Sequence, residues 1–208
     1  MPSILICVPT YAKMDAPFVQ SVLSLERPCT CGIQFITDTL IAEARNRFAK
    51  EAIEGGYDYV FFMDSDMTFP TDALVKLYED NVDVVSGLYF KRRPNYSPIM
   101  YPTLRIEDDR FVFESYLDDY PEDQMVEVEG VGGGCLLIKT SVLEAIQNRF
   151  GGPFDQLGGM GEDFSFCLRA RECGYKIFCD TRVVCGHQGT IIVDDKNRKS
   201  LQKIAENS

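Results

Sequence analysis

The chain has 208 residues, of which 45% are hydrophobic and 25% are charged, fractions that are typical of a globular protein and exclude a disordered one. Its 21 Lys and Arg and 32 Asp and Glu give a net charge of −11, which argues against nucleic acid or an anionic membrane as a main partner, because both bind basic surfaces. No apolar run approaches the roughly 18 residues of a transmembrane segment, and the N-terminus lacks the basic start of a signal peptide. We therefore expect a cytoplasmic protein with one domain over residues 1–208.

Strand-like and helix-like segments alternate through the first 90 residues. Strands are expected at four apolar runs: residues 3–8, 33–36, 57–63 and 82–88. Helices are expected at the three amphipathic segments between them: residues 15–25, 38–54 and 71–78. Asp38 is the expected cap of the second helix, because a short side-chain oxygen can accept a hydrogen bond from the first turn. This order predicts a Rossmann-like α/β fold, with a parallel sheet and helices on both of its faces.

The pattern changes after residue 90. A loop that contains proline is expected over residues 91–105. Two antiparallel strands are expected next, over 110–116 and 125–131, with an acidic turn at 118–123 between them. The remaining elements are expected in this order: strand 135–138, helix 141–150, helix 162–173, strand 176–179, strand 183–185 and a polar tail over 191–208 with at most one surface helix. The sheet is therefore expected to be mixed, with a small antiparallel zone in its second half. The eight cysteines match no zinc-binding spacing, so free thiols are expected.

Two aspartates follow the most hydrophobic strand of the sequence. Asp64 and Asp66 are two residues apart, so on an extended segment their side chains point the same way. In open α/β sheets, ligands bind at the carboxyl ends of the strands. Two neighbouring carboxylates repel each other unless a cation lies between them, and a divalent cation with oxygen ligands suits this position. A solvated turn is the alternative, since Asp and Ser favour turns. We expect a metal site here.

Two further segments carry polar groups suited to a site. Glu162 and Asp163 follow a glycine-rich segment at the start of an expected helix, where the helix dipole stabilises carboxylates. Taken alone, this segment is explained as well by an ordinary helix start. His187 is the only histidine in the chain and follows an expected strand. A lone histidine is more often a packed or surface residue than a ligand, so neither segment defines a site by itself.

In their order along the chain, these segments resemble a glycosyltransferase of the GT-A fold, close to the family 2 type. The resemblance spans about residues 3–190. It implies that residues 1–90 bind a nucleotide sugar and that residues 91–190 hold the acceptor and the catalytic groups. It also implies Mn²⁺ or Mg²⁺ as the metal, a UDP- or GDP-sugar as the donor, and an acceptor that the motifs do not identify.

The resemblance assigns roles on the donor side. It implies donor contacts from six residues: Pro9, Thr10, Tyr11, Arg45, Asp64 and Ser65. The first three stand in the segment that cradles the nucleotide base, and Ala44-Arg45-Asn46 is similar to a helix motif near the nucleotide. Asp64-Ser65-Asp66 resembles the DxD motif that holds the metal and the diphosphate. The implied metal ligands are Asp64, Asp66 and His187, with Asp66 as the most direct one.

On the acceptor side, Gly132-Gly133-Gly134-Cys135 resembles the turn that leads to the acceptor. Glu162 and Asp163 resemble the ED motif, whose aspartate is the usual catalytic base, and this implies an inverting transfer with Asp163 as the base. Lys91-Arg92-Arg93 either steers the donor diphosphate or an anionic acceptor, or belongs to a solvated loop. The chain has no Trp and so lacks the Gln-x-x-Arg-Trp motif of processive synthases.

Two other functions fit parts of the sequence. Asp64-Ser65-Asp66-Met67-Thr68 matches the D-x-D-x-T motif of haloacid-dehalogenase-type phosphatases, in which the first aspartate is the nucleophile. That motif normally follows the first strand, whereas here it follows the third, and no later Gly-Asp-x-x-x-Asp segment occurs. A non-catalytic module that binds sugar nucleotides is the second alternative, because a fold does not determine a function.

Overall fold

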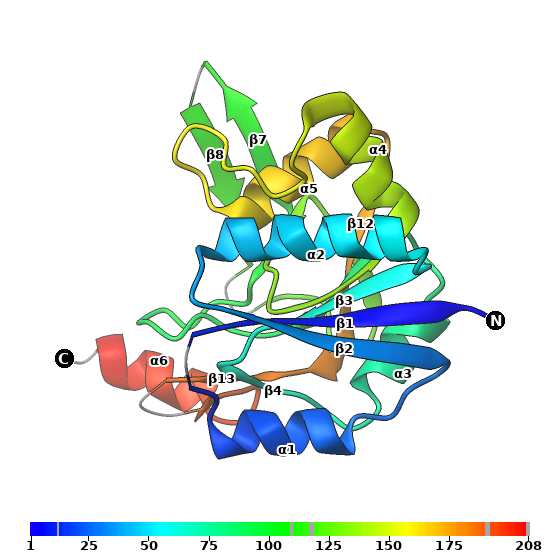
Figure 1. Ribbon diagram of the computed structural model, residues 1–208. Coiled ribbons are helices and arrows are strands. Elements are labelled where there is room, and N and C mark those ends of the chain that lie inside the picture. Colours follow the sequence, from blue (N-terminus) through cyan, green and yellow to red (C-terminus); the bar gives the residue numbers. More distant parts are fainter. Residues whose placement is uncertain (12, 109, 117–118, 190–191, 207–208) are drawn as a thin grey trace.

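A seven-stranded mixed sheet forms the centre of the protein in the computed structural model, which describes residues 1–11, 13–108, 110–116, 119–189 and 192–206 (Figure 1). Its strands are, in spatial order, β2 (Thr30–Thr37), β1 (Ser3–Thr10), β3 (Tyr59–Met63), β11 (Cys135–Lys139), β5 (Val84–Leu88), β12 (Ile177–Val184) and β9 (Met125–Val128). Strands β2, β1 and β3 are parallel neighbours, whereas β11 lies antiparallel between β3 and β5. The carboxyl ends of β1, β3 and β5 therefore share one edge of the sheet.

Helices cover both faces of the sheet (Figure 1). One layer consists of α2 (Ile41–Gly55), α4 (Thr140–Phe150) and α5 (Glu162–Glu172), and the other of α1 (Ala16–Ser24) and α3 (Ala73–Glu79). The last helix, α6 (Arg198–Glu206), lies near the carboxyl edge. The predicted α/β architecture with helices on both faces is confirmed. No helix in the described ranges has the length and apolarity needed to cross a membrane.

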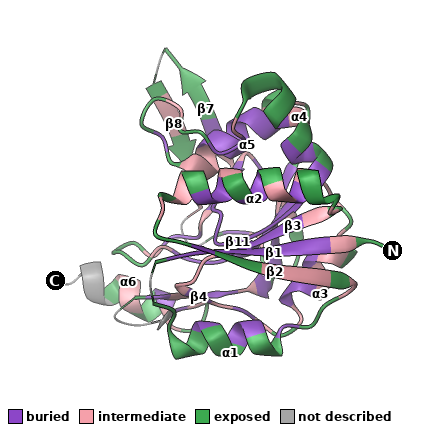
Figure 2. Ribbon diagram, in the orientation of Figure 1, coloured by how far each residue is buried: buried purple, intermediate pink, exposed green. Residues whose placement is uncertain are grey.

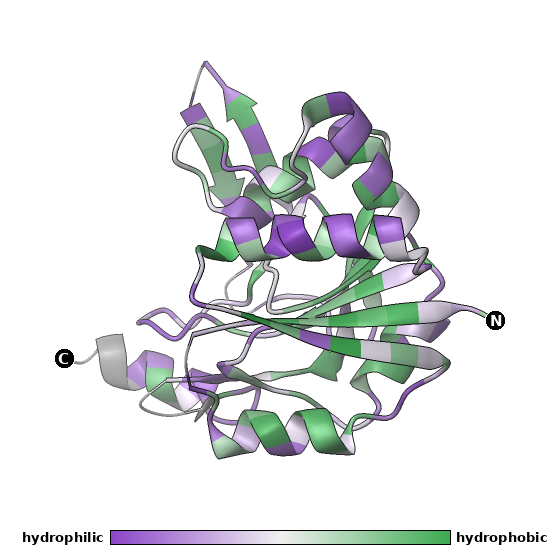
Figure 3. Cartoon of the chain, viewed as in Figure 1, coloured by the Kyte–Doolittle hydropathy of each residue, from purple (hydrophilic) through white to green (hydrophobic). Residues whose placement is uncertain are grey.

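Alternation along the central strands produces two hydrophobic cores. In β3, Val60 and Phe62 belong to the core under α2, α4 and α5, whereas Phe61 and Met63 belong to the core over α1 and α3. Successive side chains of a strand point to opposite faces, so a strand covered on both sides must be hydrophobic throughout. The buried central strands and the exposed outer faces of the helices are visible in Figure 2, and Figure 3 shows the matching hydropathy.

Small antiparallel sheets complete the fold. They pair β6 (Met100–Tyr101) with β10 (Gly130–Val131), β7 (Thr103–Glu107) with β8 (Arg110–Glu114), and β13 (Gly186–Gln188) with both β4 (Met67–Thr68) and β14 (Ile192–Val193). The pairing of β13 with β4 carries the segment after β12 back to the end of β3. All eight cysteines are free thiols, as expected.

Several predicted details of the second half are wrong. The expected strands at 110–116 and 125–131 do not pair: β8 pairs with β7, which lies inside the expected loop, and β9 pairs with β12. Pairing with β7 closes a much shorter connection than pairing across residues 115–124, and so costs less chain entropy. The two expected late strands are one strand, β12, with an irregularity between Asp180 and Val184. Residue 118 of the expected acidic turn and residues 191, 207 and 208 of the expected tail lie outside the described residues.

Asp38 does not cap α2. The helix begins three residues later, at Ile41, and Leu40 is its N-cap. The φ angle of Asp38 is 57°, a left-handed conformation that Asp tolerates better than most residues, so Asp38 lies in the turn before the helix.

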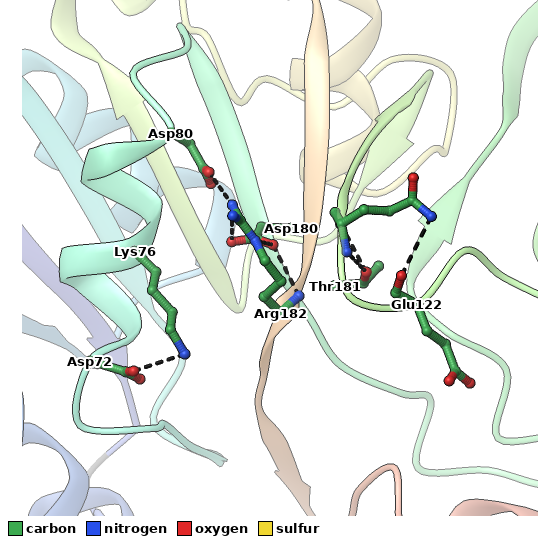
Figure 4. Close-up of polar contacts among 8 residues, drawn as sticks. Asp72, Lys76, Asp80, Glu122, Asp180, Thr181 and Arg182 are labelled. Carbon is green, nitrogen blue, oxygen red and sulfur yellow. Dashed lines mark hydrogen bonds and ion pairs between the residues drawn. The ribbon is translucent and has the colours of Figure 1, made fainter.

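A cluster of charged side chains joins the end of α3 to β12 (Figure 4). Arg182 donates hydrogen bonds to Asp80, at the end of α3, and to the buried Asp180 with an Nε–Oδ1 distance of 2.8 Å. The second oxygen of Asp80 is buried and has no hydrogen-bond partner. Burial, together with the charge of Asp180, raises the pKa of Asp80 to about 6.

Asp80→Asn is expected to gain stability relative to the wild type as pH rises from 4 to 7. Because the folded-state pKa of Asp80 is raised, its contribution to stability is full at low pH and is lost as pH rises through about 6. The difference in unfolding free energy between the variant and the wild type should shift by at least about 1 kcal/mol in favour of the variant over this range. Urea unfolding at several pH values measures it, and a difference that is constant with pH would contradict the assignment.

Candidate functional site

A cavity of about 410 Å³ lies where the predicted aspartate pair leaves the sheet. Its walls come from the end of β1 and the segment after it, from the end of β2 and the start of α2, and from the turn after β3. Five of the six residues expected to contact a donor line it, and so does Asp66: Pro9, Thr10, Tyr11, Asp64, Ser65 and Asp66. Lys13 and Asp15 also lie at the cavity. The shared sheet edge explains this grouping, because β1 and β3 are parallel neighbours and end together.

A second hollow, of about 480 Å³, lies at the β9 edge of the sheet. Its charged side chains already form two ion pairs, Lys176 with Glu127 and Arg171 with Glu129, each at 2.8 Å. The cavity at the carboxyl edge is the better candidate site, because it gathers the segment after β1 and the aspartate pair at the sheet edge where ligands of α/β folds bind.

Arg45 lies behind this cavity and holds Asp64. The residue is 1% exposed, and its Nη2 donates to Asp64 Oδ1 at 2.8 Å. Its Nη1 donates to the carbonyl oxygen of Gly133 at 2.9 Å, and its Nε lies 3.3 Å from Glu162 Oε1. Burial raises the pKa of Asp64, and the charge of Arg45 opposes this effect. Arg45 was expected beside the nucleotide, but it does not line the cavity; it joins the turn after β3 to the start of α5.

Asp66 and His187 come together at the cavity rim. The pairing of β13 with β4, and a 2.7 Å hydrogen bond from the backbone N–H of Gln188 to the carbonyl of Asp66, place His187 there. His187 Nε2 lies 3.7 Å from Asp66 Oδ2, and its Nδ1 lies 2.7 Å from the carbonyl oxygen of Phe90. Because a carbonyl can only accept, Nδ1 donates this hydrogen bond, which leaves Nε2 on the side of Asp66.

The pKa of Asp66 is lowered from its ordinary value. Burial would raise it, but His187 and Arg92 outweigh burial. Arg92 Nη1 donates to Asp66 Oδ2 at 2.8 Å and to the carbonyl of Gln188 at 3.1 Å. The sequence left the loop of Arg92 with two alternatives, and in the structure this side chain contacts Asp66.

The side-chain groups at this rim are suited to bind a divalent cation. Asp66 supplies a carboxylate and His187 an imidazole nitrogen, while one oxygen of Asp64 is held by Arg45. Within the part of the chain that the structure describes, no group of three or more His, Cys, Asp or Glu side chains is arranged to hold a metal ion. Mg²⁺ commonly takes only one or two protein carboxylates and completes its shell with substrate phosphates and water. An imidazole ligand favours Mn²⁺ over Mg²⁺.

Glu162 and Asp163 begin α5 beside the same cluster. The backbone N–H of Phe164 donates to Asp163 Oδ1 at 2.8 Å, which fixes the carboxylate at the helix start. Burial is the main cause that raises the pKa of Asp163 to about 6, and the charge of Glu162 is the second. The charge of Arg45 opposes this shift. Asp163 is therefore a stronger base than an ordinary aspartate and remains mostly ionised at neutral pH.

The glycine triplet before β11 makes room for this arrangement. A Cβ on Gly133 would lie 2.5 Å from the Arg45 guanidinium carbon, and one on Gly132 would lie 2.0 Å from the Tyr89 hydroxyl. That hydroxyl accepts a 3.0 Å hydrogen bond from the N–H of Gly134. Tyr89 is thus buried under the triplet, which explains why the chain needs consecutive glycines here.

Gly133→Ala is expected to lower the unfolding free energy by about 1–3 kcal/mol, because the added methyl group collides with the Arg45 guanidinium. Urea unfolding of the single variants and of the Gly133→Ala/Arg45→Ala double variant measures the contact directly. The double variant should be no less stable than Arg45→Ala alone, since the collision is gone. Additive losses would show that Gly133 acts elsewhere.

Structural comparison places this arrangement among known folds. The chain is similar to the crystal structure of A197 from STIV, with a TM-score of 0.62 and 18% identity over 90% of this chain and 85% of that one. It is also similar to the crystal structure of GalNAc-T7 with UDP, GalNAc and Mn²⁺, a GT-A glycosyltransferase, with a TM-score of 0.58 and 11% identity over 90% of this chain and 43% of that one. Neither the family models nor the curated proteins gave a match. The protein therefore has a GT-A-like fold.

Proposed function

We propose that the chain is a metal-dependent glycosyltransferase of the family 2 type, which transfers a sugar from a nucleotide-diphosphate donor to an acceptor with inversion. One observation carries the proposal: the segment after β1 and the Asp64-Ser65-Asp66 turn line one cavity, and Arg45 ties that turn to Glu162 at the start of α5. Donor-binding and base-catalytic groups of such an enzyme need this proximity, because transfer joins the donor sugar to the acceptor oxygen in one step.

In this proposal residues 1–90 bind the donor. Pro9, Thr10 and Tyr11 hold the nucleotide base of the donor, and the exposed ring of Tyr11 is free to stack on it. Asp66 and His187 hold the divalent cation, with Asp64 assisting, and Ser65 contacts the donor. When bound, the cation neutralises the charge that develops on the departing nucleoside diphosphate. The Mn²⁺ and UDP in the GalNAc-T7 structure support this choice of ligands.

Residues 91–190 supply the acceptor side. Asp163 removes the proton from the acceptor hydroxyl, since its pKa of about 6 leaves it ionised at neutral pH. Glu162 raises that pKa and faces Arg45, so it supports the base. Inversion requires the base on the side opposite the leaving diphosphate, and α5 lies in the helix layer of α2, on the other face of the sheet from α1 and α3 (Figure 1).

A thermal-shift screen of UDP- and GDP-sugars, with and without Mn²⁺, tests the proposal. A true donor should stabilise the protein by about 2.7 kcal/mol at a hundredfold excess over Kd, and only when Mn²⁺ is present. If no sugar nucleotide changes the melting temperature under either condition, the proposal is wrong. Hydrolysis of an aryl phosphate through an aspartyl-phosphate on Asp64 would support the phosphatase instead. Donor binding without hydrolysis or transfer would support a non-catalytic module.

A further inference from the structure

The guanidinium of Arg92 lies at Asp66, where a bound metal cation would also lie. Its Nη1 lies 2.8 Å from Asp66 Oδ2, the same oxygen that faces His187 Nε2 at 3.7 Å. A metal bound by Asp66 and His187 would therefore compete with the Arg92 guanidinium for one carboxylate oxygen. In the structure, Arg92 satisfies the negative charge that such a metal would otherwise neutralise.

The contact between Arg92 and Asp66 is readily exchanged. The two side chains are 46% and 41% exposed, and ion pairs between exposed side chains contribute little net stability. The backbone of the loop, in contrast, is fixed: the N–H of Lys91 donates to Ser97 at 3.0 Å, and Gln202 donates to the carbonyl of Asn95 at 2.6 Å. Exchange therefore requires only rotation of the Arg92 side chain about its flexible stem.

A donor diphosphate needs a cationic partner at this rim. The chain carries a net charge of −11, and Arg45 is buried and already engaged by Asp64 and Glu162. Arg92 lies beside Asp66, which lines the cavity, and a guanidinium can bind phosphate oxygens with two parallel hydrogen bonds.

We infer that Arg92 is an exchangeable counter-ion: it neutralises Asp66 in the unliganded chain, gives up this carboxylate when a divalent cation binds, and then binds the diphosphate of the donor. Only the last step, binding of the donor diphosphate, rests on the proposed function. It predicts that loss of Arg92 has opposite effects on two ligands: the bare metal binds more tightly, and the nucleotide binds more weakly.

Arg92→Gln tests this exchange, with Arg93→Gln as the matched control. Arg93 lies in the same loop, is exposed, and forms no ion pair among the described residues, so its replacement reports the long-range effect of one lost charge. Calorimetry and the EPR signal of free Mn²⁺ measure Mn²⁺ affinity without nucleotide. Arg92→Gln should bind Mn²⁺ about two- to fivefold more tightly than the wild type, the range expected for removal of an exposed ion pair, whereas Arg93→Gln should differ by less than about twofold.

The second arm uses UDP and GDP at saturating Mn²⁺. The nucleoside diphosphate used is the one that the wild type binds. Its affinity for Arg92→Gln should be about tenfold weaker than for the wild type, and its affinity for Arg93→Gln should be unchanged. Unchanged or weaker Mn²⁺ binding by Arg92→Gln overturns the inference, and so does unchanged nucleotide affinity. If the wild type binds neither UDP nor GDP, the proposed function fails, while the Mn²⁺ arm still decides whether Arg92 and a metal compete for Asp66.

Discussion

Replacement of Asp163 by asparagine is expected to reduce kcat by at least about a hundredfold, while donor and metal affinities stay close to those of the wild type. Asparagine is nearly isosteric, and its side-chain oxygen can still accept the 2.8 Å hydrogen bond from the N–H of Phe164, so the start of α5 should be unchanged. Only the ability to take a proton is lost. Steady-state kinetics with the donor found in the screen, together with calorimetry, separates the two effects.

The pH dependence adds a second readout for Asp163. In the wild type, kcat/KM should fall as pH falls through about 6, because protonation removes the base. The residual activity of Asp163→Asn should lack this fall. Asp72→Asn, in the opposite helix layer, is the control and should keep both the rate and the profile. Near-native turnover by Asp163→Asn, or a product with the anomeric configuration of the donor, would contradict the assignment.

Arg45→Ala is expected to lower the unfolding free energy by about 3–5 kcal/mol, because it leaves two partly buried carboxylates without their shared cation. Arg45 contacts Asp64 at 2.8 Å and Glu162 at 3.3 Å, and it also satisfies the carbonyl of Gly133. The loss should be smaller at pH 5 than at pH 7, since burial raises the pKa of Asp64 and Arg45 would no longer oppose this shift, so that its protonation relieves the repulsion. Urea unfolding at both pH values measures these differences.

Arg47→Ala is the matched control for Arg45. Arg47 lies two residues further along α2 with an exposed side chain, so its loss should change stability by less than about 0.5 kcal/mol. Arg45→Lys should recover only part of the stability, because an ammonium cannot reproduce the planar set of donors that meets two carboxylates and a carbonyl. A loss below about 1 kcal/mol for Arg45→Ala would show that Arg45 is not what holds the two halves of the site together.

The parallel half of the fold was predictable because its signals are local. Each strand there is a short apolar run, and each helix has a hydrophobic face and a clear stop, such as Gly56 after α2. The gathering of the segment after β1 and the Asp64-Ser65-Asp66 turn at one edge follows from the parallel order alone. The insertion of β11 between β3 and β5 was not predictable, because strand order depends on packing between segments distant in the sequence.

The burial of Arg45 could have been predicted from its position in the helix, although not from the amino-acid composition. Ile41, Arg45, Phe48 and Ala52 are spaced by four, three and four residues, so Arg45 lies on the same helical stripe as the buried apolar residues of α2. A charged residue on such a stripe requires an opposite charge in the core. The contact of Arg92 with Asp66 left no comparable signal, because it depends on how the loop after β5 folds back over the sheet edge.

The most direct test of the central claim is calorimetric binding of UDP and GDP to the wild type and to Asp66→Ala, with and without Mn²⁺. Asp66 is 41% exposed at the cavity rim, so its truncation should leave the fold intact, and Asp72→Ala serves as the control for loss of a surface carboxylate. The account predicts that the wild type and the control bind one nucleoside diphosphate only when Mn²⁺ is present, and that Asp66→Ala binds neither nucleotide. Metal-dependent nucleotide binding by Asp66→Ala with unchanged affinity would contradict it.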